Sequence, residues 1–514
     1  MSRPREPLLL GALLLLASFL ILETALSAGY YPVQADETTL AWAAKQVSLG
    51  RVPYADFFTI LPPLTLYGLG AFFKVAGASL GALRLLTLAW ILLIALTQYG
   101  LLLRAAMPPR WAFLGALSFP SVFFPFWPLP SHHWFALGFG LLALFLCREG
   151  DVSRRRAAVA GALCGLSGLC LQTDGALFSA VLSLRLLTSG APGRDRARSL
   201  AAALGGIALP LGLFGGLLAL SGALRWAWFD LVQWPARFYK QPGGFNDINP
   251  FEFMERTVRH AVPEAWTPSA AAPLLTLAVA MAFPLLALIW PALAPGWRLG
   301  SLTRRWAHTS AALALTFVLF LKGRPDWTHL VFLSPILFLF VAAAVDWKEE
   351  RLRPLLLQIW LGAVLAVGLL RWPLAWVSAP PNALDVWAVD GMLKKYSVPA
   401  LVDALPGVRD GNLPVLYLAR DGSTLYFYWA PVPPPMDWVL PPSARYNSQW
   451  EYEVLAAFAR EQRVRYIVLR REEAASFREE PSPLATLLNE EYRFLSDTPY
   501  GVILERNDHG PSAP

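Results

Sequence analysis

The chain has 514 residues, of which 56% are hydrophobic and only 15% are charged. Soluble domains carry about 25% charged residues, so this composition excludes an ordinary soluble enzyme and indicates a polytopic membrane protein. The net charge of +7 does not indicate a nucleic-acid partner, because the arginines lie in short loops between apolar segments.

Long apolar segments recur from the N-terminus to Trp372. A membrane-spanning helix needs roughly 20 residues, and the sequence predicts about eleven such helices. They are expected at 7–27, 82–103, 111–127, 132–147, 157–172, 174–189, 199–221, 270–294, 306–321, 329–346 and 354–372. The first follows two arginines but is long and lacks a convincing cleavage site, so we interpret it as an uncleaved helix.

Basic residues predict how these helices are oriented, because short cytoplasmic loops are enriched in Lys and Arg. Every second loop is basic. The residues that mark these loops are Arg3, Arg5, Arg104, Arg110, Arg148, Arg154, Arg155, Arg156, Arg194, Arg196, Arg198, Arg298, Arg304, Arg305, Lys348, Arg351 and Arg353. The alternation predicts a cytoplasmic N-terminus and an extracytoplasmic C-terminus. It also requires residues 61–80 not to span, so we expect them to form an amphipathic segment at the outer membrane surface.

The composition changes after Trp372, and two domains are predicted: 1–375 in the membrane and 376–514 outside it. The second part holds most of the acids and no apolar segment long enough to span. Strands are expected at 415–419, 424–429, 465–470 and 500–505, and helices at 451–460 and 484–491. The predicted fold class is therefore mainly α, a polytopic membrane helical bundle with a small C-terminal extracytoplasmic α/β domain.

The long first outer loop, residues 28–81, opens with two adjacent carboxylates, Asp36 and Glu37. Acids at the edge of a membrane are costly to hold and mark functional sites by default. The pair is equally consistent with solvated charges, with Asp36 or Thr38 capping a short helix. The segment from Gly50 to Pro63 is rich in Gly, Pro and aromatic residues and is expected to form an ordered loop.

The loop resembles that of a known family. The residues that carry the resemblance are Asp36-Glu37, Gly50, Pro53-Tyr54-Ala55-Asp56, Pro62-Pro63, Gly77 and Arg84. Their spacing is similar to the first extracytoplasmic loop of the membrane-embedded GT-C glycosyltransferases. The nearest groups are the protein O-mannosyltransferases and the bacterial enzyme that adds 4-amino-4-deoxyarabinose to lipid A. The latter enzymes have a lysine before the loop proline, where this chain has Leu61.

The resemblance implies an enzyme that moves a hexose or pentose from a polyprenyl-phosphate donor to an extracytoplasmic acceptor hydroxyl, with inversion at the anomeric carbon. The acceptor class, whether lipid, glycan or protein, stays open. Asp36 matches the family's catalytic acid, and Glu37 is a second-choice base or an orienting residue. Tyr54 and Asp56 are expected to shape the sugar site, and Arg84 is a candidate for binding the phosphate.

His132 and His133 open a predicted helix on the outer side, where the family often has an acidic or other polar residue. They are either interfacial histidines at a helix start or groups that hydrogen-bond phosphate or sugar. A third option is a metal ligand with Asp36, so a divalent metal stays open although no cofactor is assigned. The three cysteines, Cys147, Cys164 and Cys170, lack the paired spacing of a zinc set.

A second polar cluster, Lys322-Gly323-Arg324-Pro325-Asp326-Trp327-Thr328-His329, lies in a predicted outer turn. Positive residues also accumulate at helix ends without function. The alternative is a clamp in which Lys322 and Arg324 bind the donor phosphate and Asp326 orients Arg324, with His329 beside them.

The sequence thus predicts a glycosyltransferase in a bacterial inner (plasma) membrane, whose partners are the lipid bilayer, a polyprenyl-phosphate donor and an extracytoplasmic acceptor. The alternative is a flippase or transporter of a lipid-linked saccharide. A transporter is expected to show two related halves with interrupted helices near the middle of the membrane. The sequence shows no such symmetry, and its polar residues cluster on one side.

Overall fold

The computed structural model describes residues 5–27, 35–105, 107–124, 129–147, 153–238, 415–418, 449–469, 471–479, 481–498 and 501–507, with isolated positions between 332 and 405. The first part is helical. Its elements are α1 (Arg5–Ser27), α2 (Ala35–Ser48), α3 (Pro63–Ala76), α4 (Leu80–Arg104), α5 (Pro109–Ser118), the π-helical turn η1 (Phe119–Phe123), α6 (His132–Leu146), α7 (Arg154–Cys170), α8 (Gln172–Leu187), α9 (Gly193–Leu220), α10 (Leu224–Trp228), the π-helical turn η3 (Phe229–Gln233) and α11 (Trp234–Phe238).

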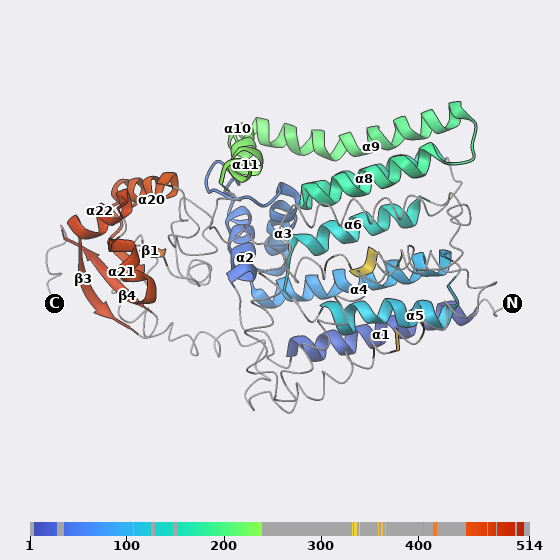
Figure 1. Cartoon of the computed structure of the whole chain (residues 1–514), viewed down its shortest axis with the longest axis horizontal. Coiled ribbons are helices and arrows are strands. Elements are labelled where there is room, and N and C mark those ends of the chain that lie inside the picture. The colour runs from blue at the N-terminus through green and yellow to red at the C-terminus, as the bar shows by residue number, and fades with distance from the viewer. Residues whose placement is uncertain are drawn as a thin grey trace, which may run out of the picture.

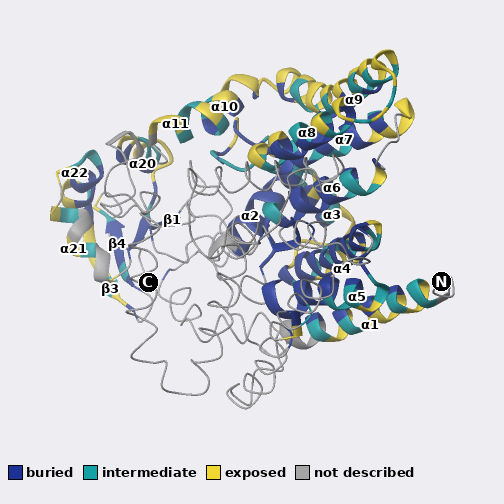
Figure 2. Cartoon of the chain, turned by 45° about the vertical axis from the view of Figure 1, so that its right-hand side comes forward, coloured by how far each residue is buried: buried dark blue, intermediate teal, exposed yellow. Residues whose placement is uncertain are grey.

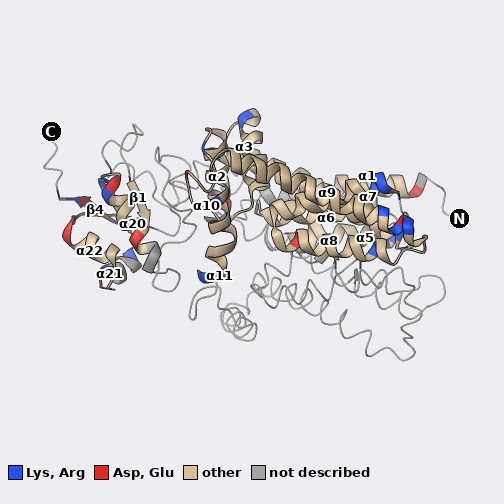
Figure 3. Cartoon of the chain, turned by 90° about the horizontal axis from the view of Figure 1, so that it is seen from above, with Lys and Arg blue, Asp and Glu red and all other residues tan. Residues whose placement is uncertain are grey.

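The long helices lie side by side in a bundle, and α2, α3, α10 and α11 gather at the end away from the N-terminus (Figure 1). Lys and Arg residues of the bundle are concentrated at the opposite end, where the chain begins (Figure 3). Within the described residues, α4 and α9 are long and apolar enough to cross a membrane, and α1 and α6 contain shorter apolar helices. The charge separation along the bundle agrees with the alternation of basic loops in the sequence.

The predicted helices up to residue 221 are confirmed with small shifts at their ends. The one predicted at 111–127 is shorter: α5 ends at Ser118, and η1 follows because Pro120 has no amide to continue the helical hydrogen bonds. The four helices predicted between 270 and 372 lie outside the described residues, apart from single helical positions such as Phe332 and Leu361.

The short helix that the sequence left open within the first outer loop is α2, Ala35–Ser48, and it begins before Asp36, so Asp36 lies in its first turn. The Ala-rich sequence of α2 has high helix propensity, and two acids lie in its first turn, where the helix dipole favours negative charge. The α3 helix, started by Pro62-Pro63, has 14 residues, which at 1.5 Å per residue is too short for a bilayer core of about 30 Å. The prediction that 61–80 does not span is consistent with this length.

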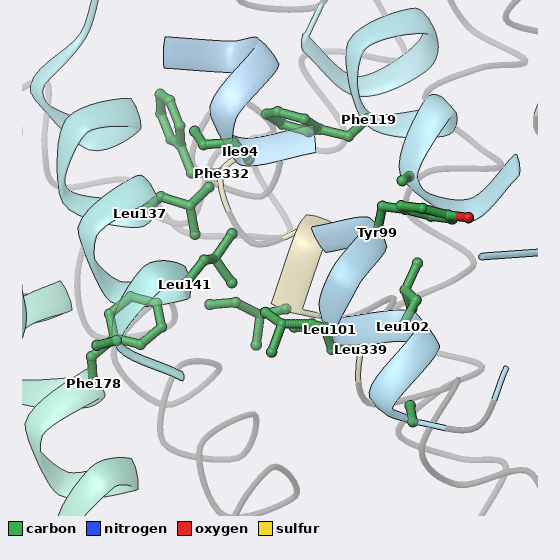
Figure 4. Close-up of a cluster of buried hydrophobic side chains, with 14 of the residues drawn as sticks. Ile94, Tyr99, Leu101, Leu102, Phe119, Leu137, Leu141, Phe178, Phe332 and Leu339 are labelled. Atoms are coloured by element: carbon green, nitrogen blue, oxygen red, sulfur yellow. The ribbon is translucent and has the colours of Figure 1, made fainter. Parts of the chain in front are cut away.

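The core of the bundle is a cluster of buried aliphatic and aromatic side chains from α1, α4, α5, α6, α7 and α8. Figure 4 shows Ile94 of α4 facing Leu137 and Leu141 of α6, with Phe178 of α8 beside them. Because these side chains come from helices far apart in the sequence, their burial fixes the arrangement of the helices that end at the outer loops.

Helices α7 and α9 pack through small residues. A Cβ added at Gly161 of α7 would overlap the carbonyl of Ala203, and one added at Gly206 of α9 would overlap the carbonyl of Ala158. Small residues let membrane helices approach this closely. The other side of α9 exposes Leu209, Leu213 and further leucines, as Figure 2 shows in yellow along the helix. This pattern suits a helix at the lipid-facing edge of the bundle.

The C-terminal part forms a four-stranded sheet with the order β1-β2-β4-β3. Its elements are β1 (Val415–Leu418), α20 (Gln449–Glu461), β2 (Tyr466–Leu469), α21 (Arg471–Glu479), α22 (Pro483–Glu490), β3 (Tyr492–Asp497) and β4 (Val502–Arg506). Strands β1 and β2 are parallel, with Val415 opposite Tyr466, and the other two pairs are antiparallel. The predicted helices at 451–460 and 484–491 are confirmed, as are the strands at 415–419, 465–470 and 500–505.

Both faces of β1, β2 and β4 are buried, whereas most of β3 is exposed. Leu416, Ile467 and Leu504 pack in one cluster with residues of α20 and α22. The residues that alternate with them, including Tyr417, Tyr466 and Val468, are also buried and belong to a second cluster. The sequence analysis did not predict β3 or α21, because the strongly polar segments 471–479 and 492–497 give neither a clear apolar period nor a continuous apolar run. The strand predicted at 424–429 lies outside the described residues.

Candidate active site

Among the described residues, a buried ion pair is the main electrostatic feature at the end of the bundle away from the N-terminus. Arg84, in the second turn of α4, donates from Nε to Oε1 of Glu37 and from Nη2 to Oε2, both over 2.6 Å. The Glu37 side chain is 0% exposed and that of Arg84 is 9% exposed. A bidentate, charge-assisted pair of this kind fixes both side chains in direction as well as distance. It therefore ties the start of α2 to the start of α4.

The ion pair limits the roles that are open to Glu37 and Arg84. Both oxygens of Glu37 accept hydrogen bonds from Arg84, which favours the orienting role over the role of a base. Two of the Arg84 N–H groups point at Glu37, so any contact with a phosphate would use the remaining donors of the guanidinium. Asp36 precedes Glu37 in the first turn of α2, and its backbone position is set by the anchored neighbour.

The loop after α2 is held by its own polar groups. Tyr54 adopts a left-handed backbone, with φ of 72°, and its hydroxyl donates to the Leu61 carbonyl over 2.7 Å. The Asp56 carboxylate accepts from the Val52 amide over 2.7 Å. The Tyr54 ring is buried, whereas Asp56 is exposed, so of the two it is Asp56 that is open to a ligand. Both residues shape the loop, and their predicted contact with a sugar stays a prediction.

The histidine pair lies at the start of α6. The Ser131 hydroxyl accepts from the His133 amide, so the serine caps the helix. The two imidazole rings are 4.3 Å apart between centroids, and that of His133 stacks on Phe332 at 4.2 Å. Phe135, in the same turn of α6, packs on Trp90 of α4, which places the histidines at the same end of the bundle as Arg84. Among the residues that the structure describes, no three His, Cys, Asp or Glu side chains gather as a metal site would require.

The structure therefore brings Asp36, Glu37, Arg84 and the two histidines to one end of the bundle, with the Tyr54–Asp56 loop following α2. The second predicted cluster, Lys322, Arg324, Asp326 and His329, lies outside the described residues. Its relation to the first cluster stays a prediction.

One buried acid was missed by the sequence analysis. Asp230 lies in η3, is 3% exposed, and accepts a hydrogen bond on Oδ2 from the Thr59 amide over 3.1 Å. Burial raises the pKa of its carboxyl to about 8, and the Thr59 hydrogen bond offsets part of this increase. Its signal in the sequence is weak, a single acid within Trp226–Trp234, where the tryptophans are typical of an interfacial segment.

Comparison with solved structures identifies the fold as that of the GT-C glycosyltransferases, which confirms the resemblance predicted from the first outer loop. A crystal structure of ArnT from Cupriavidus metallidurans bound to undecaprenyl phosphate matches with a TM-score of 0.55 and 14% identity, covering 98% of this chain and 99% of that one. The apo state of the same enzyme matches with a TM-score of 0.55 and 12% identity, over 97% of each chain.

A crystal structure of the Archaeoglobus fulgidus oligosaccharyltransferase in complex with zinc and sulfate matches with a TM-score of 0.45 and 15% identity, covering 96% of this chain and 73% of that one. The fold assignment rests on the two ArnT structures. Scans against sequence-family models and against curated proteins found no match.

Proposed function

We propose that this chain is a membrane glycosyltransferase that moves a sugar from a polyprenyl-phosphate donor to a hydroxyl group outside the cytoplasm. The observation that carries the proposal is the buried Glu37–Arg84 pair next to Asp36, at the outer end of a bundle with the GT-C fold. ArnT, which has a similar fold, was crystallised with undecaprenyl phosphate, a ligand of the proposed donor class. The outer end of the bundle is where a lipid donor from the bilayer and an acceptor from water can meet.

The proposed reaction is an inverting displacement at the anomeric carbon. The acceptor oxygen attacks that carbon while its proton passes to the Asp36 carboxylate, which acts as general base. The bond from the anomeric carbon to the phosphate oxygen breaks, and its electron pair leaves with the polyprenyl phosphate. Because a phosphate is a good leaving group, cations that stabilise its charge suffice and no strong general acid is needed.

The remaining predicted residues either position Asp36 or bind the substrate. Glu37 and Arg84 hold the start of α2 in place, which positions Asp36. His132 and His133 offer imidazole groups for hydrogen bonds to sugar or phosphate. Asp56 offers an exposed carboxylate for sugar hydroxyls on the loop that Tyr54 shapes.

The test of the function as a whole is mass spectrometry of lipid-linked sugars and envelope glycans from cells with and without the gene. Loss of the gene is expected to remove one sugar from a glycan, lipid or protein. The unused donor, that sugar linked to polyprenyl phosphate, should accumulate. The purified protein should then restore the transfer in vesicles that contain that donor. Identical glycans and lipid-linked sugars in both cell types would contradict the proposal.

Replacement of both Lys322 and Arg324 by Gln is expected to weaken the affinity for polyprenyl phosphate. Charge-assisted hydrogen bonds contribute roughly 1.5–3 kcal/mol each, so loss of two should weaken binding by at least about 100-fold. The measurement is binding of undecaprenyl phosphate to the purified variant in detergent, with Lys348→Gln as a control in a predicted cytoplasmic loop. Unchanged affinity in the double variant would reduce this cluster to a determinant of membrane orientation.

The proposed orientation in a bacterial inner membrane has the N-terminus in the cytoplasm and the C-terminus outside. A reporter that is active only in the cytoplasm, fused after Trp372, is expected to be silent, because an odd number of spans precedes it in the predicted arrangement. The same reporter fused after Arg298, in a predicted cytoplasmic loop, is the control and should be active. Strong activity after Trp372 would show that the predicted number of spans is wrong by one.

A further inference from the structure

The contact between Asp230 and Thr59 joins two outer segments that are far apart in the chain. One is the loop 51–61, which follows α2, and the other is 224–238, which follows α9. Thr59 is fully buried, and Asp230 is 3% exposed. The Thr59 amide donates to Oδ2 of Asp230 over 3.1 Å. A buried backbone amide needs such a partner, so loss of the carboxyl would leave it unsatisfied.

Two apolar contacts join the same segments. The ring of Phe58 meets that of Trp234 edge to face, with centroids 5.4 Å apart. The Tyr54 ring lies in a small buried cluster with Ala223 and Ala227. The loop 51–61 is thus held along its length by the 224–238 segment, with the Asp230 carboxyl as the polar contact between two apolar ones.

The described residues around Asp230 offer little that would stabilise a charge. It forms no ion pair within the described residues. On the facing loop, the Tyr54 hydroxyl is the titratable group that interacts with it, and burial raises the pKa of that tyrosine well above its usual value, so the tyrosine is neutral. On its own segment, Arg225 lies over the Trp226 ring and is exposed to solvent, as is Arg237.

These contacts lead to the inference, which rests on the proposed glycosyltransferase function. We infer that Asp230 is a positioning residue: in its protonated form it holds the loop 51–61 in place, and thereby holds Asp56 and the turn formed by Tyr54 in the geometry that binds the sugar. When Asp230 ionises, the buried carboxylate gains more from hydration than from its one amide partner, and the contact between the two segments opens.

The direction with pH follows from the raised pKa of Asp230, about 8, against roughly 4 for an unfolded aspartic acid. Between these two values the folded state holds a proton that the unfolded state has lost. The contribution of this group to stability therefore falls as the pH rises from about 4 to about 8, and it is constant above that. The loop should therefore be held best near pH 4 and below, and progressively less well as the pH rises to about 8.

The test compares Asp230→Asn with Asp230→Ala in the purified full-length protein. Asn keeps an oxygen that accepts from the Thr59 amide and cannot ionise, whereas Ala removes the acceptor. Asp195→Ala, at the other end of α9, is the matched control for loss of an acid. The readouts are amide hydrogen exchange of the 51–61 segment, corrected for the intrinsic effect of pH, and transfer kinetics as a function of pH.

Wild type and Asp195→Ala are expected to lose protection of 51–61 by about tenfold between pH 6.5 and pH 9, as expected for the loss of one buried hydrogen bond. Asp230→Asn should keep its protection at both pH values, and Asp230→Ala should lack it at both. In kinetics, Asp230→Ala should raise KM for the donor by about tenfold with a smaller change in kcat, and Asp230→Asn should restore KM.

Equal protection of 51–61 in wild type at both pH values, or normal protection in Asp230→Ala, would overturn the inference. If Asp230→Ala does not fold, Asp230→Asn still tests the inference. Protection of 51–61 that changes with pH in this variant as it does in wild type would overturn it. The exchange measurement needs no donor, so it separates this inference from the proposed function. Loop protection that behaves as expected in a folded protein without transfer activity would contradict the function and leave the contact standing.

Discussion

Asp36→Asn is expected to lower the rate of sugar transfer by about 10²- to 10⁴-fold, the usual contribution of a general base. The amide keeps the size and most of the hydrogen bonds of the carboxylate but does not take a proton. The affinity for undecaprenyl phosphate should stay within about twofold of wild type, because the base acts on the acceptor and not on the donor phosphate. The fall should therefore appear in kcat.

The same substitution at the neighbouring acid, Glu37, is the comparison for Asp36→Asn. Glu37→Gln, measured only on folded protein, is expected to lower the rate less, since Glu37 acts through Arg84 and the position of α2. Asp56→Asn, on the exposed loop carboxylate, is a second comparison. Near-normal transfer by Asp36→Asn, together with loss of transfer in either of the other two variants, would show that the base is a different acid.

Removal of one partner of the Glu37–Arg84 pair is expected to destabilise the protein by about 3–5 kcal/mol, because it leaves a buried charge without its counter-charge. Arg84→Met leaves the Glu37 carboxylate in this position, and Glu37→Gln leaves the guanidinium. Both single variants should unfold at a clearly lower temperature than wild type in the same detergent.

The double variant Glu37→Gln, Arg84→Met removes both charges and should recover most of the stability lost in the single variants. Transfer activity is the second readout. If the pair positions Asp36, the double variant should fold well and still transfer sugar slowly. Full activity in the stable double variant would contradict the positioning role, and equal instability of all three variants would contradict the energetic account of the pair.

Much of the bundle could be predicted from the sequence because membrane helices leave a strong signal. Apolar segments of about 20 residues bounded by arginines locate helices such as α4 and α9 with errors of a few residues at their ends. The short α2 leaves a weaker signal. It is mixed in composition, begins with two acids and is followed by a Gly–Pro-rich loop, so its helical propensity competed with turn-forming neighbours.

The site was predicted only as a set of polar residues, because the contacts that give them roles are long-range. Glu37 and Arg84 are 47 positions apart, and the sequence predicted a base or orienting role for Glu37 and phosphate binding for Arg84 before the structure paired them with each other. Asp230 and Thr59 are 171 positions apart, and neither has a neighbour in the sequence that indicates the other. Pairing between elements depends on how the helices pack, and no local pattern records it.

The close contact between α7 and α9 also determines where the segment after α9 lies along the bundle. At Gly161 and Gly206 the backbone of each helix rests against the other, so α9 has no side-chain layer there that can yield if it slides along its axis. Helix α9 leads through Gly222 into α10 and η3, which carry Asp230. The position of Asp230 along the bundle is therefore set by two glycines of the α7–α9 contact, and in the proposed membrane arrangement we expect α9 not to shift independently of α7 when the bilayer thickness changes.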